Sequence, residues 1–314
     1  MILTPDSAPL TRDIADYPEG IIIPIDKPYR WTSADVIRKI KYAAIRHFGK
    51  KNLKVGHAGT LDPLATGVLL VCIGKATKLA EELQSHDKEY VAGVTFGATT
   101  PSYDLEKEID RFFPHEHISA EAVENALPSF IGEQDQIAPL FSAKSVDGVR
   151  AYELARKLYK ANSENESVQS SELDTAAEQL LRVSRINITE LELLSFADRN
   201  EGLLDRATRG TEAGGPQAER SGGVSEANVH EPSSCQHATT ASSRINVTDN
   251  SALGLPRAEI RMACSKGTYV RAFARDLGEA LGSGAHLDSL QRSRSGQFRV
   301  ENALSVEQAL QKLQ

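Results

Sequence analysis

Short apolar runs recur along the chain, and each has the length of a single strand. Residues 20–25 and 68–73 are almost uninterrupted aliphatic runs, which predict two buried strands. Residues 90–96 alternate apolar and polar positions, as a half-buried strand does. Residues 183–196 and 258–263 indicate two further strands.

Helical segments lie between these strands, and polar caps mark several of their starts. Thr32 or Ser33 is expected to cap a helix that runs to Phe48, and Ser305 with Gln308 matches a capping box before a final helix. Other helices are predicted over residues 76–84, 119–127, 150–159 and 270–281. Because strands and helices are mixed without regular alternation, we predict an α+β domain and not a doubly wound sheet.

The composition changes between residues 198 and 256. This stretch is rich in Gly, Ser, Thr, Ala and Asn, contains no Phe, Trp or Tyr, and shows no hydrophobic period. Such a sequence buries too little apolar surface to offset an ordering cost of ~1–2 kcal/mol per residue. We therefore predict a low-complexity, disordered insertion over 198–256 and a smaller one over 161–178. Residues 20–197 and 257–314 then form a single domain, preceded by an N-terminal extension over 1–19.

The overall composition is that of a globular protein. The chain has 314 residues, of which 40% are hydrophobic and 25% charged. Residues 1–19 lack the basic and apolar pattern of a secretion signal, and no later run is long enough to span a membrane. Cys72, Cys235 and Cys264 are far apart and match neither a metal site nor a disulfide framework. We therefore expect a protein of the cytoplasm that holds no metal.

Charge is distributed unevenly along the chain, whose formal net charge is −7. Residues 27–90 contain 12 Lys and Arg against 6 Asp and Glu, and residues 257–300 contain 8 against 4. Residues 105–135 reverse the sign, with 2 basic against 8 acidic residues. Because local charge decides where a polyanion docks, the two basic segments could form one face for a nucleic acid. Two separate solvated helix faces would give the same counts.

The clearest signal for chemistry is the segment GHAGTLDPLATGVL, residues 56–69. Its single carboxylate, Asp62, precedes Pro63 and is flanked by glycines, so it lies in a stiff turn directly before an apolar strand. A rigid loop at the end of a core strand can hold a reacting group in place. Asp before Pro is also a common turn starter, and spacing alone favours that simpler interpretation.

The segment resembles, without a gap, the catalytic loop of the TruB family of tRNA pseudouridine synthases. Further matches follow in the same order along the chain: Asp26-Lys27-Pro28, Thr32-Ser33, Lys88-Glu89-Tyr90, Phe141-Ser142-Ala143-Lys144, Ser265-Lys266-Gly267-Thr268-Tyr269-Val270-Arg271 and Gly284-Ala285-His286-Leu287. The resemblance implies the pseudouridine synthase fold, with a mixed, mostly antiparallel central sheet flanked by helices and loops. In that fold the 198–256 insertion would join two strands that pair. The implied reaction needs no cofactor and no metal.

The resemblance also implies a catalytic set of three residues. In the implied reaction the N1–C1′ bond of a uridine breaks, the uracil turns over, and C5 bonds to C1′. Asp62 would be the essential acid, acting at C1′ as a nucleophile or as a proton acceptor. Arg271 would pair with Asp62 through a charge-assisted bond, and Tyr90 would stack on the uracil and relay a proton at C5. On sequence alone, Arg271 could be a surface arginine and Tyr90 an ordinary strand aromatic.

A second set of residues is expected to contact RNA or to line the pocket. His57 would fill the space left by an everted base, and Leu290 would line the pocket wall. The remaining candidates are basic residues that would contact phosphates or support the acid loop: Lys27, Lys88, Lys144, Arg150, Lys266 and Arg292. For Lys27, support of the acid loop together with Pro28 is the expected role.

The implied substrate is the T-arm of tRNA, at position 55, and we expect a monomer. The match departs at Arg30 and Lys107, where glycine is usual. The chain ends soon after Phe298, whereas many relatives continue into a small RNA-binding domain, so we expect RNA affinity to rest on the catalytic domain. Two other functions stay open: a non-catalytic chaperone that refolds the T-arm, and a glycosidase that releases free uracil.

Overall fold

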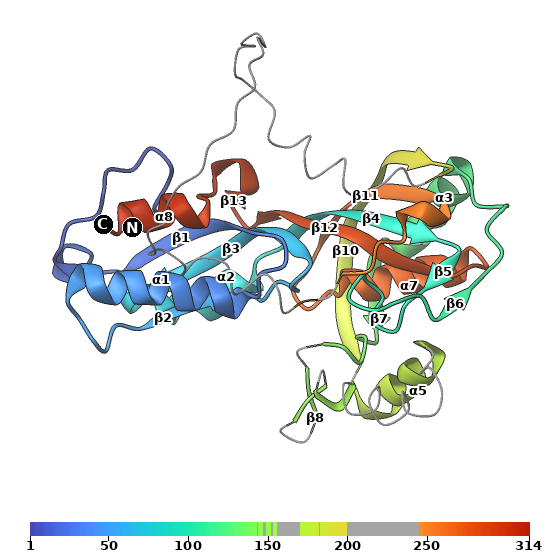
Figure 1. The fold of residues 1–314 in the computed structure, drawn as a ribbon, viewed down its shortest axis with the longest axis horizontal. Coiled ribbons are helices and arrows are strands. Elements are labelled where there is room, and N and C mark those ends of the chain that lie inside the picture. Colours follow the sequence, from blue (N-terminus) through green and yellow to red (C-terminus); the bar gives the residue numbers. More distant parts are fainter. Residues whose placement is uncertain are drawn as a thin grey trace, which may run out of the picture.

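The structure is a computed structural model, and it describes residues 1–142, 144–146, 149–151, 153–155, 170–181, 183–199, 245 and 247–314. One twisted sheet runs along the length of an elongated molecule, with helices packed at both ends (Figure 1). The two chain termini lie side by side at one of these ends (Figure 1). The predicted α+β class is confirmed.

The main sheet has nine strands among the described residues, in the order β1-β3-β12-β4-β11-β10-β7, with β2 paired to β3 and β13 to β12. The pairing of β12 with β3 is parallel, and the other pairings in this sheet are antiparallel. This confirms the mixed, mostly antiparallel sheet. The strands are β1 (Ile21–Lys27), β2 (Val55–Ala58), β3 (Ala65–Ile73), β4 (Lys88–Phe96), β7 (Gly132–Gln136), β10 (Ser184–Ala197), β11 (Arg257–Cys264), β12 (Ala285–Ser295) and β13 (Phe298–Arg299).

Helices cover the sheet, and short hairpins decorate it. Helix α1 contacts β2 and α8 contacts β1, whereas α7 packs on β12 and α3 on β10. The α-helices are α1 (Ser33–Phe48), α2 (Ala80–Ser85), α3 (Ala120–Ala126), α5 (Ser170–Leu180), α7 (Val270–Ala280) and α8 (Val306–Lys312). The short strands pair as β5 (Ala98–Thr99) with β6 (Arg111–Phe112), and β8 (Ser145–Val146) with β9 (Val149–Arg150). The 3-10 helices are Ile14–Asp16, Gly74–Leu79, Leu127–Phe130, Ser251–Leu253 and Val300–Asn302.

Helix α1 forms where the cap and the apolar pattern predicted it. Thr32 and Asp35 make a capping box, since each side chain accepts a bond from the other residue's backbone N–H. Val36, Ile40 and Ala44 are fully buried against the sheet. The basic residues of this 16-residue helix therefore face solvent. The first residue of the helix contacts the loop that follows β2.

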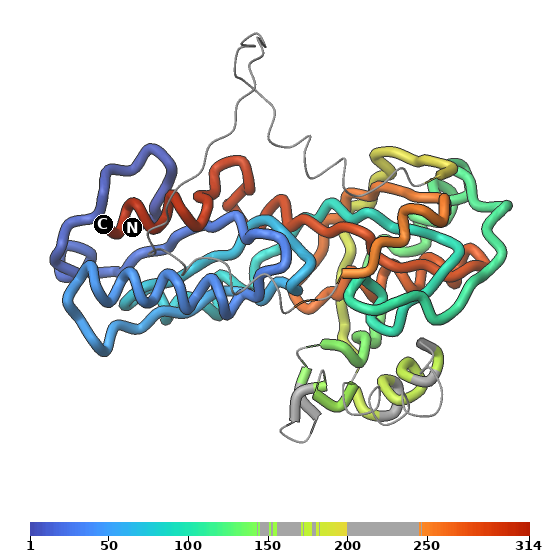
Figure 2. Tube along the Cα trace, in the orientation of Figure 1, coloured from blue at the N-terminus to red at the C-terminus, as the bar shows by residue number. Residues whose placement is uncertain are grey.

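The N-terminal extension is part of the main core. Leu3 and Leu10 are buried in the same cluster as β1 and α1. Leu10 N–H donates to the carbonyl of Lys312 at 3.0 Å, and Lys312 Nζ donates to the carbonyl of Pro5 at 2.9 Å. Figure 2 shows this contact between the blue start and the red end of the chain. The predicted boundary at residue 20 therefore does not separate two units.

The long insertion joins two adjacent strands, as predicted, because β10 and β11 pair antiparallel from Ile188↔Cys264 to Ala197↔Arg257. Residues 200–244 and 246 lie outside the described residues. The predicted end of the disordered stretch at 256 is wrong, since Leu255 is 4% exposed and Thr248 N–H donates to the carbonyl of Leu105 at 2.9 Å. The last residues before β11 are thus packed on the domain.

The region between β7 and β10 differs in part from its prediction. Helix α5 occupies most of the second half of the predicted 161–178 insertion, and it buries Leu173 and Ala177 in a small separate core. In Figure 1 this helix lies with β8 in a lobe beside the sheet. Of the predicted 150–159 helix, residues 151 and 153–155 are helical and Arg150 belongs to β9. The rest of that prediction lies outside the described residues.

Candidate active site

The acid loop, residues 59–64, connects β2 to β3 and is held at several points. The Oγ of Ser33, at the start of α1, accepts a bond from Leu61 N–H at 2.9 Å and donates to the Leu61 carbonyl at 3.2 Å. Asp62 C=O accepts from Ala65 N–H at 3.1 Å, which closes the turn around Pro63. Gly67 follows with φ +95°, and a Cβ there would lie 2.3 Å from the carbonyl oxygen of Arg292. The loop is therefore fixed at both ends.

Asp62 forms an ion pair with Arg271. The Nε of Arg271 donates to Oδ2 of Asp62 at 2.9 Å, across 209 positions of sequence. The Asp62 side chain is 39% exposed, whereas that of Arg271 is 6% exposed. The carboxylate thus reaches solvent while its partner is buried beneath it. The expected juxtaposition of these two residues is present.

The guanidinium of Arg271 is fixed by three further groups. Its Nη1 donates to the carbonyl of Ser102 at 3.0 Å, and its Nη2 donates to the carbonyl of Phe141 at 2.8 Å. The Asp104 carboxylate lies 3.7 Å from Nη1. Burial alone would lower the pKa of Arg271, but the nearby carboxylates, with Asp62 first, outweigh it and raise the pKa. Arg271 therefore stays charged and cannot rotate freely.

Lys27 supports the acid loop from below. Its side chain is fully buried, and its Nζ donates to the carbonyls of Pro28, Trp31 and Pro63 at 2.9, 2.6 and 3.2 Å. Burial lowers its pKa to about 7, against the raising effect of Asp62. Because the ammonium is enclosed, Lys27 has no access to an RNA phosphate. Its place in the set of RNA contacts is corrected to loop support, the role expected from its position before Pro28.

Arg292 is also a buried structural residue. It is 1% exposed, and it donates from Nε to the carbonyl of Val68 at 2.7 Å and from Nη2 to the carbonyl of Gly59 at 3.1 Å. These bonds tie β12 to the start of the acid loop and to β3, the strand that follows it. Tyr90, on β4 opposite Arg292, is 9% exposed. Burial raises the pKa of Tyr90, so its hydroxyl is neutral.

An open pocket of about 350 Å³ lies between the acid loop and the start of α7. Asp62 and Arg271 lie on one side of it, and Tyr90 and Leu290 contribute to its walls. Lys266 is exposed at its edge, and Lys144 lines it while donating to Ser184 Oγ at 2.6 Å. The structure therefore brings eight of the predicted site residues to one cavity: Asp62, Tyr90, Arg271, Leu290, Lys88, Lys144, Lys266 and Arg292.

Lys88 and His57 are placed differently from their predictions. Lys88 borders the pocket, but it is 5% exposed and its ammonium donates to the carbonyls of Gln84 and His86, so it is not a free phosphate contact. His57 is half-buried on β2 and does not line the pocket; burial lowers its pKa, and its Nδ1 has no hydrogen-bond partner among the described residues. The side chain of Arg150 lies outside the described residues.

Two residues at the site were not predicted as site residues. Tyr269 lines the pocket next to Arg271, and its N–H donates to Oε1 of Gln136 at 2.8 Å. Asp104 is buried, and burial raises its pKa although Arg271 acts in the opposite direction. Tyr269 lies within the matched segment that contains Arg271, so its position was a usable signal. Asp104 lies in a stretch where the family match is only partial, and it was given no role at the site.

Arg30, one of the two departures from the family pattern, adopts a left-handed backbone conformation. Arg30 has φ +63°, a left-handed conformation that glycine adopts with less strain. Its Nη2 donates to the carbonyl of Ile245 at 2.7 Å. The arginine thus replaces the usual glycine while it contacts the end of the insertion.

No group of three or more His, Cys, Asp or Glu side chains suited to a metal ion occurs in the described part of the chain. None of the described helices is long and apolar enough to cross a membrane.

Comparison with known proteins identifies the family. The family model for the N-terminal domain of TruB family pseudouridylate synthases matches residues 46–201. The "tRNA pseudouridine synthase B" of Phocaeicola vulgatus is 44% identical over 292 residues, which cover 93% of this chain and 92% of that protein. The chain belongs to the TruB family of pseudouridylate synthases. The TruB relative from Flavobacterium johnsoniae is 36% identical over 93% of this chain and 95% of its own length.

Solved structures match this TruB family chain more distantly. A chain in "Crystal structure of the archaeal box H/ACA sRNP Nop10-Cbf5 complex" is 19% identical, with a TM-score of 0.49 over 98% of this chain. A chain in "Crystal Structure of a Cbf5-Nop10-Gar1 Complex" is 22% identical, with a TM-score of 0.48. The chain spans about half the length of these matched chains.

Proposed function

We propose that this TruB family enzyme isomerises the uridine at position 55, in the T-loop of tRNA, to pseudouridine, with Asp62 as the essential carboxylate. The curated relatives are tRNA pseudouridine synthases, and the chain covers more than nine-tenths of their length. One observation carries the assignment of the site: the solvent-reaching Asp62 is bonded to the buried Arg271 at the side of a pocket.

The reaction is an isomerisation in which no atom is gained or lost overall. The N1–C1′ bond breaks, the C5–C1′ bond forms, C5 loses a proton and N1 gains one. A carboxylate that acts at C1′, as nucleophile or as proton acceptor, must be held at a fixed angle to the sugar. Arg271 provides this by bonding one oxygen of Asp62, which leaves the other oxygen available to the substrate.

The pocket can hold the uracil base while the base is detached from its ribose. Its volume of about 350 Å³ is within the range of small-ligand sites. Tyr90 offers a ring against which uracil can stack, and Leu290 offers an apolar wall. Lys266 and Lys144 provide positive charge for flanking phosphates. A uridine must first be unstacked from its loop, which costs a few kcal/mol that such contacts offset.

We also propose that the enzyme works in the cytoplasm, as a monomer that needs no cofactor. Burial raises the pKa of the Cys72 and Cys264 thiols to about 11 each, which keeps both in the unreactive thiol form.

The test is to incubate the protein with an unmodified tRNA transcript and to map pseudouridine by chemical labelling. We expect a single modified position, at 55, with no free uracil. Modification elsewhere, or none by folded protein, would refute the substrate assignment. Release of free uracil would instead identify a glycosidase, and tRNA refolding without any product would identify a chaperone.

A further inference from the structure

A basic face covers helix α1 and the turn that follows it. Between residues 33 and 54 the chain has seven Lys and Arg but one acid, Asp35. All seven cations are exposed to solvent. This set, called here the basic face, consists of Arg38, Lys39, Lys41, Arg46, Lys50, Lys51 and Lys54.

The cations of the basic face are almost unpaired. Arg38 bonds to Asp35 at 2.9 Å, and Lys39 lies 5.6 Å from the centre of the Trp31 ring. Among the described residues, no carboxylate lies within 4 Å of the other five cations. The chain has a net charge of −7 and is rich in acids, yet its sequence has a single acid, Asp35, between residues 33 and 54. Uncompensated charge of this kind suits a polyanion.

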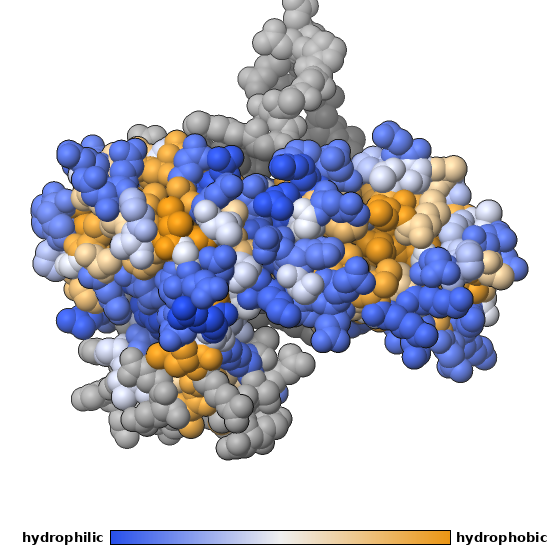
Figure 3. Space-filling view, turned by 180° about the vertical axis from the view of Figure 1, so that it is seen from behind, coloured by the Kyte–Doolittle hydropathy of each residue, from blue (hydrophilic) through white to orange (hydrophobic). Residues whose placement is uncertain are grey.

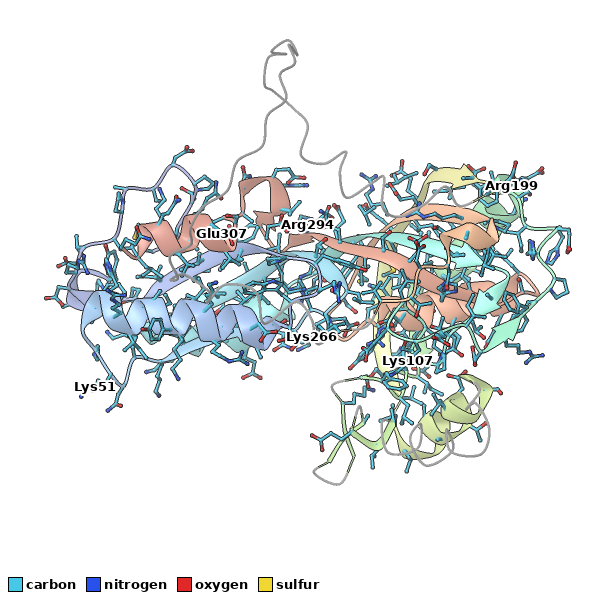
Figure 4. All side chains as sticks on the ribbon, viewed as in Figure 1. Lys51, Lys107, Arg199, Lys266, Arg294 and Glu307 are labelled. Atoms are coloured by element: carbon cyan, nitrogen blue, oxygen red, sulfur yellow. The ribbon has the colours of Figure 1, made fainter. Side chains whose placement is uncertain are left out.

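The position of α1 connects the basic face to the pocket. Ser33, the first residue of α1, is bonded to Leu61 of the acid loop, and the helix then leads away for 16 residues. At about 1.5 Å per residue, Arg46 lies roughly 20 Å along the helix from Ser33. In Figure 4 Lys266, at the pocket, and Lys51 both lie on the lower side of the molecule, while Glu307 and Arg294 lie on the upper side. Figure 3, the view from behind, shows apolar surface only in patches between hydrophilic ones.

We propose that the basic face binds the phosphate backbone of the substrate RNA beyond the arm whose uridine enters the pocket. This rests on the proposed function, since it needs an RNA whose loop is held at Asp62. A stem of five base pairs extends only about 17 Å at the 3.4 Å per pair of a B-form duplex, and less in compact RNA helices. A stem of this length that runs along α1 from the acid loop ends before Arg46, so we assign Arg46 and the cations after it to contacts with a larger folded RNA.

The test compares a full tRNA transcript with an isolated hairpin of five base pairs that carries the T-loop. The test variant is Arg46→Glu with Lys50→Glu. The control is Arg111→Glu with Arg199→Glu, which makes the same charge change on two other exposed cations. Arg199 is labelled at the opposite end of the molecule from Lys51 (Figure 4). All four side chains are exposed, so we expect melting temperatures close to that of the wild type.

For the test variant we expect affinity for full tRNA to fall about tenfold or more. The slope of log K against log salt should decrease by roughly 1.4–1.8, because the variant neutralises two fewer phosphates. Affinity for the hairpin and kcat on the hairpin should stay within twofold of wild type. Unchanged tRNA affinity, an equal loss on the hairpin, or an equal loss in the control pair would overturn the proposal. If wild-type protein fails to modify the hairpin and the tRNA, the proposed function fails instead, independently of the basic face.

Discussion

Replacing Arg271 by lysine is expected to separate the catalytic from the structural contribution of the α7 arginines. Arg271 donates three hydrogen bonds, to Asp62 and to the carbonyls of Ser102 and Phe141, in a fork that an ammonium cannot reproduce. A hydrogen bond that involves a charged group contributes about 1.5–3 kcal/mol to stability. A variant that loses two of the three bonds is therefore destabilised by about 3 kcal/mol or more. The free energy of unfolding should fall by this amount.

A misoriented Asp62 should separately raise the activation free energy, and a rise of about 3 kcal/mol corresponds to a rate reduced roughly 100-fold. The matched control is Arg275→Lys, one helical turn further along α7. The Arg275 side chain is 11% exposed, bonds to Asp276 at 2.8 Å and Asp174 at 3.3 Å, and donates to a carbonyl, but no ion pair or hydrogen bond joins it to Asp62.

Both variants are measured by urea unfolding and by single-turnover pseudouridine formation on a tRNA transcript. We expect similar destabilisation in the two proteins, and a large rate loss only in Arg271→Lys. Equal rates in the two variants would refute the claim that Arg271 acts by orienting Asp62.

Three further predictions concern the supports of the pocket. Gly67→Ala places a Cβ against the Arg292 backbone at positive φ and should destabilise the protein by about 3 kcal/mol, measured by thermal unfolding; a wild-type melting temperature would contradict the fixed-loop geometry. Lys27→Met removes the bond to Pro63, and because the Lys27 pKa falls to about 7 on folding, the stability of wild type relative to this variant should rise with pH between about 7 and 10.5; a flat or falling difference in urea unfolding would exclude the shift. Tyr90→Phe keeps the ring that lines the pocket and removes the hydroxyl, so tRNA affinity should hold while product formation slows at least tenfold; an unchanged rate would exclude a proton relay by that hydroxyl.

Local signals in the sequence were sufficient for the elements that depend on neighbouring residues. A cap at Thr32 or Ser33 and the apolar spacing after it predicted α1, and the capping box of Ser305 with Gln308 predicted the start of α8. These patterns act within one or two helical turns, so they can be recognised without knowledge of the fold.

The burial of basic residues could not be predicted in this way. Lys27 was expected to support the acid loop and Arg292 to contact phosphate, and no local pattern predicted that both would be enclosed by backbone carbonyls, because Lys and Arg are usually exposed. For Arg292 these carbonyls come from Val68 and Gly59, more than 200 positions away. No local pattern indicates that such acceptors will be unpaired and in reach.

The pairing of Asp62 with Arg271 was predictable only through family resemblance. The two residues are 209 positions apart, and neither motif alone indicates the other. The same holds for Asp104, which joins Arg271 from a stretch where the motif is weak.

The most direct measurement is pseudouridine formation by Asp62→Asn on a tRNA transcript, with tRNA affinity measured in parallel. Asparagine keeps the size of the side chain and an oxygen that can accept from Arg271, so we expect a folded protein that binds tRNA within a few-fold of wild type and yields no detectable pseudouridine. Product formed at the wild-type rate would contradict the assignment of Asp62 as the essential carboxylate.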